Sequence, residues 1–125
     1  MASDLRARHL ILDLVDVPKH VCLDLNAWEE ALRGAATLMG MRILDSGTHV
    51  FEPPEEPGLT AFTLLDSSHF SVHTYSDRGI AAVDFFACTD RDLWAAWTFV
   101  AEALNLGAGR ISSTTYLDRF MDAPR

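Results

Sequence analysis

The sequence has few cysteines and few basic residues. Cys22 and Cys88 are its two cysteines among 125 residues, and neither belongs to a C-x-x-C pair. This usage is too sparse for a disulfide framework or a structural zinc site, so we expect a reducing, cytoplasmic environment. Lys and Arg total 10 against 18 Asp and Glu, a formal net charge of −8. Such a field disfavours nucleic acid and membrane surfaces as partners and favours a cationic small molecule.

Long apolar runs and internal repeats are also missing. The apolar run Leu10–Leu12 is interrupted by Asp13, so it predicts neither a signal peptide nor a membrane span. A composition of 49% hydrophobic and 22% charged residues is typical of a globular chain with one core. The Pro- and Glu-rich segment 52–58 can be neither a helix nor a central strand. We therefore expect a single domain over residues 1–125.

Two segments carry one-sided apolar stripes at helical spacing. The stripes are formed by Trp28, Leu32, Ala35 and Met39 and by Leu93, Trp97, Val100 and Leu104. We expect Asn26 to cap the first helix in a capping box with Glu29, and Gly40 to end it. Thr89 with Asp92 is expected to cap the second helix. The second helix is expected to close at Gly107 and Gly109.

Alternating apolar residues predict the strands of a sheet. They are expected at 8–15, 41–51, 59–65, 69–75, 80–88 and 110–117. This order predicts an α+β two-layer sandwich, with a mainly antiparallel β-sheet and two helices on one face. The other face would be bare, which often marks a dimer or a binding surface.

The predicted central hairpin has an unusual polar face. His69, Ser71 and His73 alternate with Phe70 and Val72, so the three polar side chains share one side of the strand. Two imidazoles and a hydroxyl in a row are poor core material because buried polar groups need partners. One interpretation is the solvated face of an edge strand. The other is a chemical site.

The register of the hairpin decides which residues join this face. A two-residue turn would place Ser71 opposite Asp84 and Cys88 opposite the Ser67–Ser68 junction. A bulge at Gly79 would shift the register and invert the faces. Cys88 is therefore either a neighbour of this junction or a small buried hydrophobic residue.

Three chemistries could use these residues. Zinc could bind His69, His73 and Cys88, with or without His49, but the spacing lies in a strand and no H-E-x-x-H motif is present. A Ser-His-Asp hydrolase is disfavoured because the sequence has no G-x-S-x-G motif. The third chemistry is modification of the backbone at a serine.

Residues 66–88 contain two blocks that are typical of one enzyme family. Residues 66–77 read Asp-Ser-Ser-His-Phe-Ser-Val-His-Thr-Tyr-Ser-Asp, and residues 79–88 read Gly-Ile-Ala-Ala-Val-Asp-Phe-Phe-Ala-Cys. They resemble the prokaryotic-type S-adenosylmethionine decarboxylase proenzyme, which reads Glu-Ser-His-(apolar)-Ser/Thr-Ile-His-Thr-Trp-Pro-Glu and Gly-Tyr-Ala-Ala-(apolar)-Asp-(apolar)-Phe-Thr-Cys-Gly. The likeness covers most of residues 8–105.

The resemblance implies a self-processing enzyme with a pyruvoyl group as its cofactor. The Ser68 hydroxyl would attack the carbonyl of Ser67, and the chain would split into a β chain of residues 1–67 and an α chain of residues 68–125. The pyruvoyl group left at residue 68 would react with the amine of S-adenosylmethionine and accept electrons as carbon dioxide leaves. The implied activity supplies decarboxylated S-adenosylmethionine for spermidine biosynthesis.

Further roles follow from the resemblance by position. His73 would abstract the Cα proton of Ser68, and Thr60 would support the ester intermediate where the family has a serine. Cys88 would be the general acid that reprotonates the substrate carbon. Substrate binding is implied for Phe51, Tyr75 and Asp77, as aromatic faces for adenine and sulfonium and as a carboxylate for ribose hydroxyls. The family also implies a homodimer of processed αβ units with sites near the interface. No metal is implied.

The sequence departs from the family pattern at several positions. Ser67 replaces the glutamate before the processed serine, and Asp66–Ser67 could itself imitate the acidic-Ser pair. We prefer Ser68 because the family pattern then aligns from the processed serine to His73 without a gap. Tyr-Ser-Asp at 75–77 replaces Trp-Pro-Glu, Thr89 replaces a glycine, and the loop after residue 51 is longer. We expect His49 and His69 to be structural.

These departures keep two alternatives open. The first retains the pyruvoyl chemistry but decarboxylates a basic amino acid, ornithine or arginine, which suits the altered segment 75–77 and the acidic charge. The second is an unprocessed homologue without enzymatic activity, which the substitution at Ser67 suggests.

Overall fold

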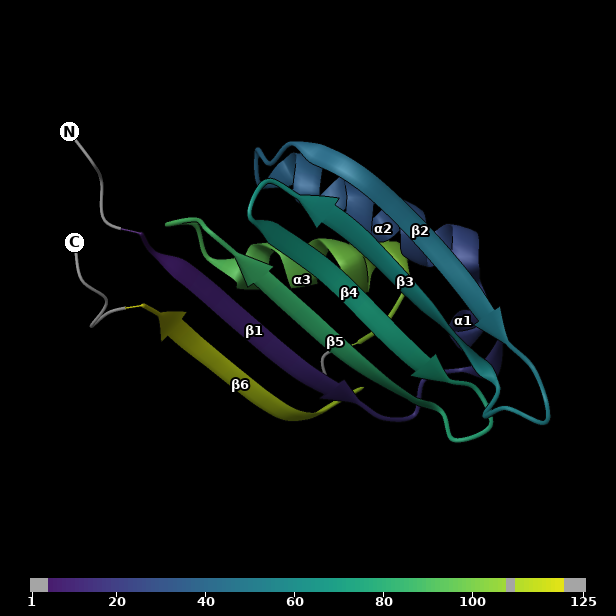
Figure 1. Cartoon of the computed structure of the whole chain (residues 1–125). Helices are drawn as coiled ribbons and strands as arrows, with labels where there is room; N and C mark the ends of the chain where they lie inside the picture. Colours follow the sequence, from purple (N-terminus) through teal and green to yellow (C-terminus); the bar gives the residue numbers. More distant parts are fainter. Residues whose placement is uncertain (1–4, 108–109, 121–125) are drawn as a thin grey trace.

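Six strands form one antiparallel sheet in the order β2-β3-β4-β5-β1-β6 in the computed structural model, which describes residues 5–107 and 110–120. The strands are β1 (Ala7–Leu14), β2 (Ile43–Phe51), β3 (Gly58–Leu65), β4 (Ser68–Tyr75), β5 (Ile80–Ala87) and β6 (Ile111–Arg119). Helices α2 (Leu25–Leu38) and α3 (Leu93–Ala103) lie together on one side of this sheet (Figure 1). The α+β two-layer architecture is therefore confirmed.

The predicted apolar stripes face the sheet. Trp28 and Leu32 of α2 and Leu93 and Val100 of α3 have 0% exposed surface. They pack onto inward-pointing strand residues in one core. The core residues of the strands include Leu10, Leu12, Leu59, Phe70, Val72, Val83 and Phe85. A third helix, α1 (Lys19–Cys22), was not predicted because four residues are too few to show a period.

The expected start of the first helix was wrong. Asp24, not Asn26, is its N-cap, and the Asp24 carboxylate accepts a hydrogen bond from the Ala27 backbone N–H at 3.1 Å. Because α1 has just ended at Cys22, Asp24 is placed to begin the next helix. Its end was predicted correctly, since Gly40 takes the left-handed conformation with φ of 71°.

The expected boundaries of the second helix also need correction. Asp92 alone caps α3 by accepting a hydrogen bond from the Trp94 N–H, and Thr89 lies in the preceding loop. The helix ends before Gly107 because Asn105 already adopts a left-handed φ of 56°. Gly109 lies outside the described residues.

The predicted hairpin register is confirmed. Ser71 lies opposite Asp84 and His73 opposite Ala82, so Gly79 introduces no shift. Phe70 and Val72 are buried against the helices, and the histidines point to the other side. We call this other side, which lies opposite α2 and α3, the open face. Its pattern of polar and apolar positions therefore follows directly from strand alternation.

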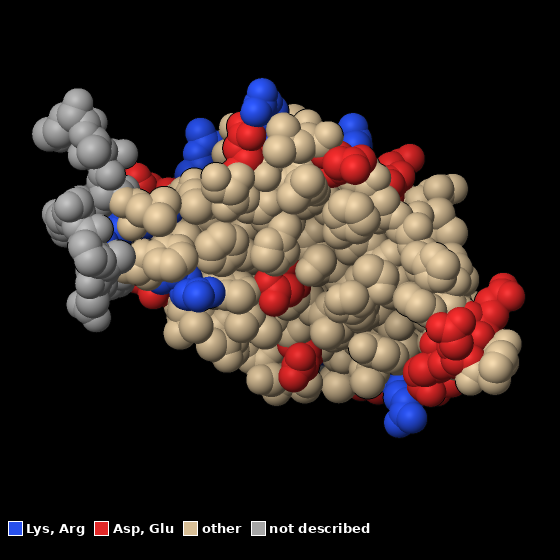
Figure 2. Space-filling model, viewed as in Figure 1, with Lys and Arg blue, Asp and Glu red and all other residues tan. Residues whose placement is uncertain are grey.

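Figure 2 shows that uncharged side chains make up most of the open face, and that acidic side chains gather at the end formed by the β2–β3 loop. Large apolar side chains on this face remain partly exposed, at 38% for Phe62, 44% for Leu64 and 45% for Leu117. In the described ranges, no helix has the length and apolar character needed to cross a membrane.

Candidate active site

The Ser67–Ser68 junction lies in the turn between β3 and β4, and Cys88 contacts both of its residues. Ser68 begins β4 with 6% exposure, and its Oγ accepts a hydrogen bond from the Cys88 backbone N–H at 2.9 Å. The Cys88 thiol donates to the carbonyl oxygen of Ser67 at 3.4 Å. Cys88 thus holds both the Ser68 hydroxyl and the Ser67 carbonyl oxygen. The β4–β5 register brings Cys88 beside the junction.

The backbone at this junction is conformationally strained. Ser67 has φ of 54°, in the left-handed region that residues with a Cβ atom rarely occupy. The preceding Asp66 is held by Arg42, whose Nε and Nη2 donate to its two carboxylate oxygens at 2.8 Å each. This hydrogen bonding lowers the pKa of the Asp66 carboxyl. A bidentate pair therefore braces the turn from the β3 side.

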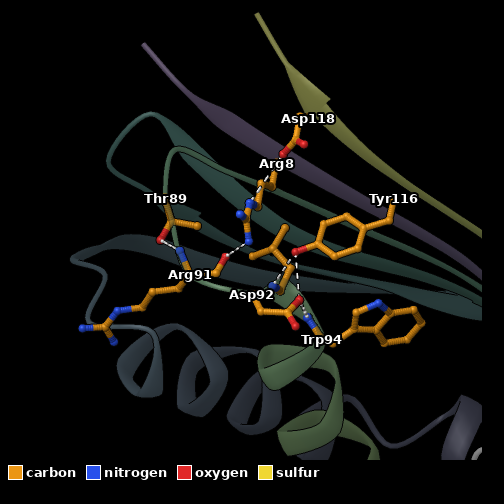
Figure 3. A network of polar contacts seen from close by, with 8 residues as sticks. Arg8, Thr89, Arg91, Asp92, Trp94, Tyr116 and Asp118 are labelled. Carbon is orange, nitrogen blue, oxygen red and sulfur yellow. Dashed lines mark hydrogen bonds and ion pairs between the residues drawn. The ribbon is translucent and has the colours of Figure 1, made fainter. Parts of the chain in front are cut away.

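A polar network fixes the loop that follows Cys88 (Figure 3). Arg8 Nη1 donates to the Arg91 carbonyl oxygen at 3.1 Å. The Tyr116 hydroxyl accepts from the Leu93 N–H at 2.8 Å and donates to the Asp92 carboxylate at 3.0 Å. Desolvation by burial raises the pKa of Tyr116. Strands β1 and β6 thereby hold the segment between Cys88 and helix α3.

Thr60 and His73 form a second cluster, at the opposite end of β4. They are directly opposed in the β3–β4 register, and Thr60 Oγ1 lies 2.7 Å from His73 Nδ1. This pair opens onto a cavity of about 320 Å³. The cavity is lined by Phe51, Glu55, Glu56, Leu59, Thr60, His73, Thr74 and Tyr75. The structure thus brings four of the predicted site residues together around one hollow.

Asp77 lies outside this cavity. Its carboxylate forms an ion pair with Lys19 Nζ at 3.2 Å, in a neighbouring hollow that Phe51 also lines. The carboxylates that do line the cavity come from Glu55 and Glu56, which sequence reasoning did not select. The unusual length of the loop that carries them was the sequence feature that could have pointed to these two residues.

A third cluster surrounds Asp84 in the middle of the open face. Asp84 Oδ1 lies 2.7 Å from His9 Nε2 and 3.4 Å from His69 Nε2. Arg119 Nη1 lies 3.0 Å from His9 Nδ1. Since a guanidinium can only donate, His9 Nδ1 accepts, and its Nε2 therefore carries the proton that is donated to Asp84. His9 and Arg119 were not selected from the sequence, although a histidine in the apolar β1 was visible.

The residues of the zinc alternative are held by different partners. His73 contacts Thr60, His69 contacts Asp84, and His49 packs edge-on against Phe51 with ring centroids 4.6 Å apart. Among the described residues, no group of three or more His, Cys, Asp or Glu side chains is arranged to hold a metal ion.

The junction and the cavity lie far apart on one chain. Ser68 and His73 lie five residue steps apart along β4, or about 16 Å at about 3.3 Å per residue. No side chain spans that distance, so His73 cannot reach the Ser68 of its own chain.

Comparison with known protein families defines the class of this protein as a decarboxylase. A family model described as S-adenosylmethionine decarboxylase matches residues 8–119. The chain belongs to the S-adenosylmethionine decarboxylase family.

Curated relatives agree with this assignment. The S-adenosylmethionine decarboxylase proenzyme of Thermosipho africanus is 33% identical over 98 residues, which cover 78% of this chain and 73% of that protein. The proenzyme of a Synechococcus species is 38% identical over 86 residues, 69% of this chain and 65% of its own. A crystal structure of the adenosylmethionine decarboxylase from Aquifex aeolicus shares the fold, with a TM-score of 0.71, 24% identity and coverage of 94% and 91% of the two chains.

Proposed function

We propose that this protein cleaves itself between Ser67 and Ser68 and then decarboxylates S-adenosylmethionine, which supplies decarboxylated S-adenosylmethionine for spermidine biosynthesis. The products would be a β chain of residues 1–67 and an α chain of residues 68–125. The observation that carries the proposal is the pair of hydrogen bonds from Cys88 to the Ser68 hydroxyl and to the Ser67 carbonyl. They engage the two groups that must react with each other.

In the first step, the Ser68 hydroxyl adds to the carbonyl carbon of Ser67, and the peptide C–N bond breaks to leave an ester and a free amine. The Cys88 thiol supports the negative charge that develops on the carbonyl oxygen. A base then removes the Cα proton of Ser68, and the carboxylate of residue 67 leaves. The remaining enamine takes up water and loses ammonia, which generates the pyruvoyl group.

The residues at the junction fit this group, because Ser68 begins a strand with its hydroxyl buried and hydrogen-bonded. The pyruvoyl group supplies an electrophilic carbonyl that withdraws electrons from the substrate as carbon dioxide leaves. Cys88, half-buried beside it, would return a proton to the substrate carbon.

The cavity suits the rest of the substrate. Phe51 and Tyr75 present aromatic rings that can stack on adenine and attract a sulfonium cation. The Thr60 hydroxyl orients the His73 imidazole, which we assign as the base that removes the Cα proton. Asp77 keeps its proposed role in ribose binding only if it leaves its ion pair with Lys19.

The separation of about 16 Å between Ser68 and His73 supports a homodimer. Two copies that pack their open faces together in antiparallel orientation bring the His73 cavity of each copy to the Ser68 junction of the other. The exposed apolar residues Phe62, Leu64 and Leu117 supply the contact surface. Each site would then contain residues from both copies, and a monomer would be unable to process itself.

Intact-mass analysis of the purified protein tests the cleavage. The wild type should yield the fragments 1–67 and 68–125, the second with a borohydride-reducible terminus, and Ser68→Ala should remain a single chain. Ser67→Ala, which keeps the hydroxyl of residue 68, should still be cut. Cleavage of Ser68→Ala would move the processed residue to Ser67, and a wild type that stays intact would contradict the proposal.

Carbon dioxide release tests the substrate. Cleaved protein should act on S-adenosylmethionine and leave ornithine and arginine unchanged. Turnover of ornithine or arginine alone would preserve the pyruvoyl chemistry and overturn the substrate assignment.

A further inference from the structure

Cleavage changes the position of His69 in its chain. In the uncut protein His69 is an interior residue of the β3–β4 hairpin, held on both sides by peptide bonds. In the α chain it becomes the second residue, directly after the keto group. Chain ends fray unless backbone pairing or side-chain contacts hold them. How precisely the keto group is positioned after cleavage therefore depends on the contacts of His69.

His69 pairs through its backbone with Leu64 of β3 and Phe86 of β5, and its side chain contacts one carboxylate and one ring on β5. His69 Nε2 lies 3.4 Å from Asp84 Oδ1, and the His69 imidazole stacks on Phe86 with centroids 5.8 Å apart. We propose that Asp84 is a positioning residue that fixes His69, and through it the keto terminus at residue 68, once the chain has been cut. This proposal rests on the proposed function.

An isolated exposed ion pair would be too weak for this task. Asp84 is not isolated, because the 2.7 Å hydrogen bond from His9 fixes its carboxylate before His69 binds. His9 is itself 16% exposed and receives a hydrogen bond from Arg119 at 3.0 Å. The Arg119 guanidinium lies 5.6 Å from the centroid of Phe86, the ring on which His69 stacks. The partner of His69 is therefore preorganised from two neighbouring strands.

The network also joins the two cleavage products. His9 lies in the segment that becomes the β chain, whereas Asp84, His69 and Arg119 lie in the future α chain. Asp84 therefore ties the new terminus of one product to β1 of the other. Before cleavage the peptide bond performs this tethering, so the carboxylate is redundant for processing and is needed only afterwards.

This difference in timing gives the test. Asp84→Ala should be cut as fast as the wild type, but its kcat for S-adenosylmethionine should fall by about 10- to 100-fold, because displacing a reacting group by about 1 Å has effects of this size. KM should change less than about threefold, since Asp84 is not among the residues that line the cavity. Asp84→Asn should lose less activity, because its amide oxygen can still accept from one imidazole.

Two readouts do not depend on turnover. Amide hydrogen exchange in the peptide that begins at residue 68 should be faster in cut Asp84→Ala than in cut wild type, and equal in their uncut Ser68→Ala backgrounds. The keto terminus should react faster with hydroxylamine in the variant. Asp45→Asn is the control, because Asp45 is an exposed strand carboxylate that accepts a hydrogen bond from the neighbouring Ser46 N–H and lies outside both the cavity and the Asp84 cluster.

His69→Ala provides a second variant if Asp84→Ala does not fold, because the His69 side chain is half-exposed. It should reproduce the loss of kcat, and the double variant should lose no more than either single one. Wild-type kcat and exchange in Asp84→Ala, or equal slowing of cleavage and turnover, would overturn the positioning role while the proposed function stands. A wild type that is never cut would remove both.

Discussion

The strained conformation of Ser67 should accelerate cleavage, and Ser67→Gly measures its contribution. A residue with a Cβ atom at φ of 54° is less stable than glycine there by about 1 kcal/mol. The strain is released when the carbonyl becomes tetrahedral and the turn opens. Glycine removes the strain from the ground state and leaves the transition state unchanged, so cleavage should slow by about fivefold. The Cys88 hydrogen bond to the backbone carbonyl is retained in this variant.

The assay follows freshly synthesised proenzyme by intact mass over time at constant temperature. Asp16→Gly is the matched control, because Asp16 has the same φ of 54° in a loop far from the junction in sequence. This control should relieve similar strain and leave the cleavage rate unchanged. Cleavage of Ser67→Gly at the wild-type rate or faster, with unchanged Asp16→Gly, would refute a contribution of strain.

Three further variants or treatments test other contacts. Iodoacetamide should alkylate Cys88 in the native protein and spare Cys22, whose thiol is buried and whose pKa is raised by desolvation, as peptide mass analysis would show. Thr60→Val should slow cleavage by at least about tenfold by removing the hydroxyl that orients His73, while Thr60→Ser should retain the rate. Tyr116→Phe should lower the free energy of unfolding in urea by about 1 kcal/mol, because the Leu93 N–H loses its acceptor. Since the folded pKa of Tyr116 is raised above 10.0, the wild type should also lose stability as pH rises from that ordinary value towards the folded one, and the variant should lose less.

The sheet was predictable because its determinants are local. Strand alternation assigned His69 and His73 to one face, and a two-residue turn fixed Asp84 opposite Ser71. Helix starts were less predictable, because Asp24 and Asn26 are equally good caps and only the preceding short helix selects between them.

The arrangement of the site was not predictable to the same extent. The motif alignment assigned Ser68 and His73 to one reaction, but an alignment contains no information about distance. In the structure, the extended strand β4 holds the two residues apart. The contacts of His9 with Asp84 join residues far apart in sequence, on strands whose adjacency follows from the sheet order. Glu55 enters the cavity through a loop whose path has no periodic signal.

The strand order has a mechanical consequence for the cut protein. Residues 1–67 contain β1, β2 and β3, and residues 68–125 contain β4, β5 and β6, yet β1 is inserted between β5 and β6 (Figure 1). The strands of the two fragments therefore alternate within the sheet. Separating the fragments requires breaking the backbone hydrogen bonds on both sides of β1 and those between β3 and β4. The proposed cleavage between Ser67 and Ser68 would therefore create a reactive end without releasing either fragment.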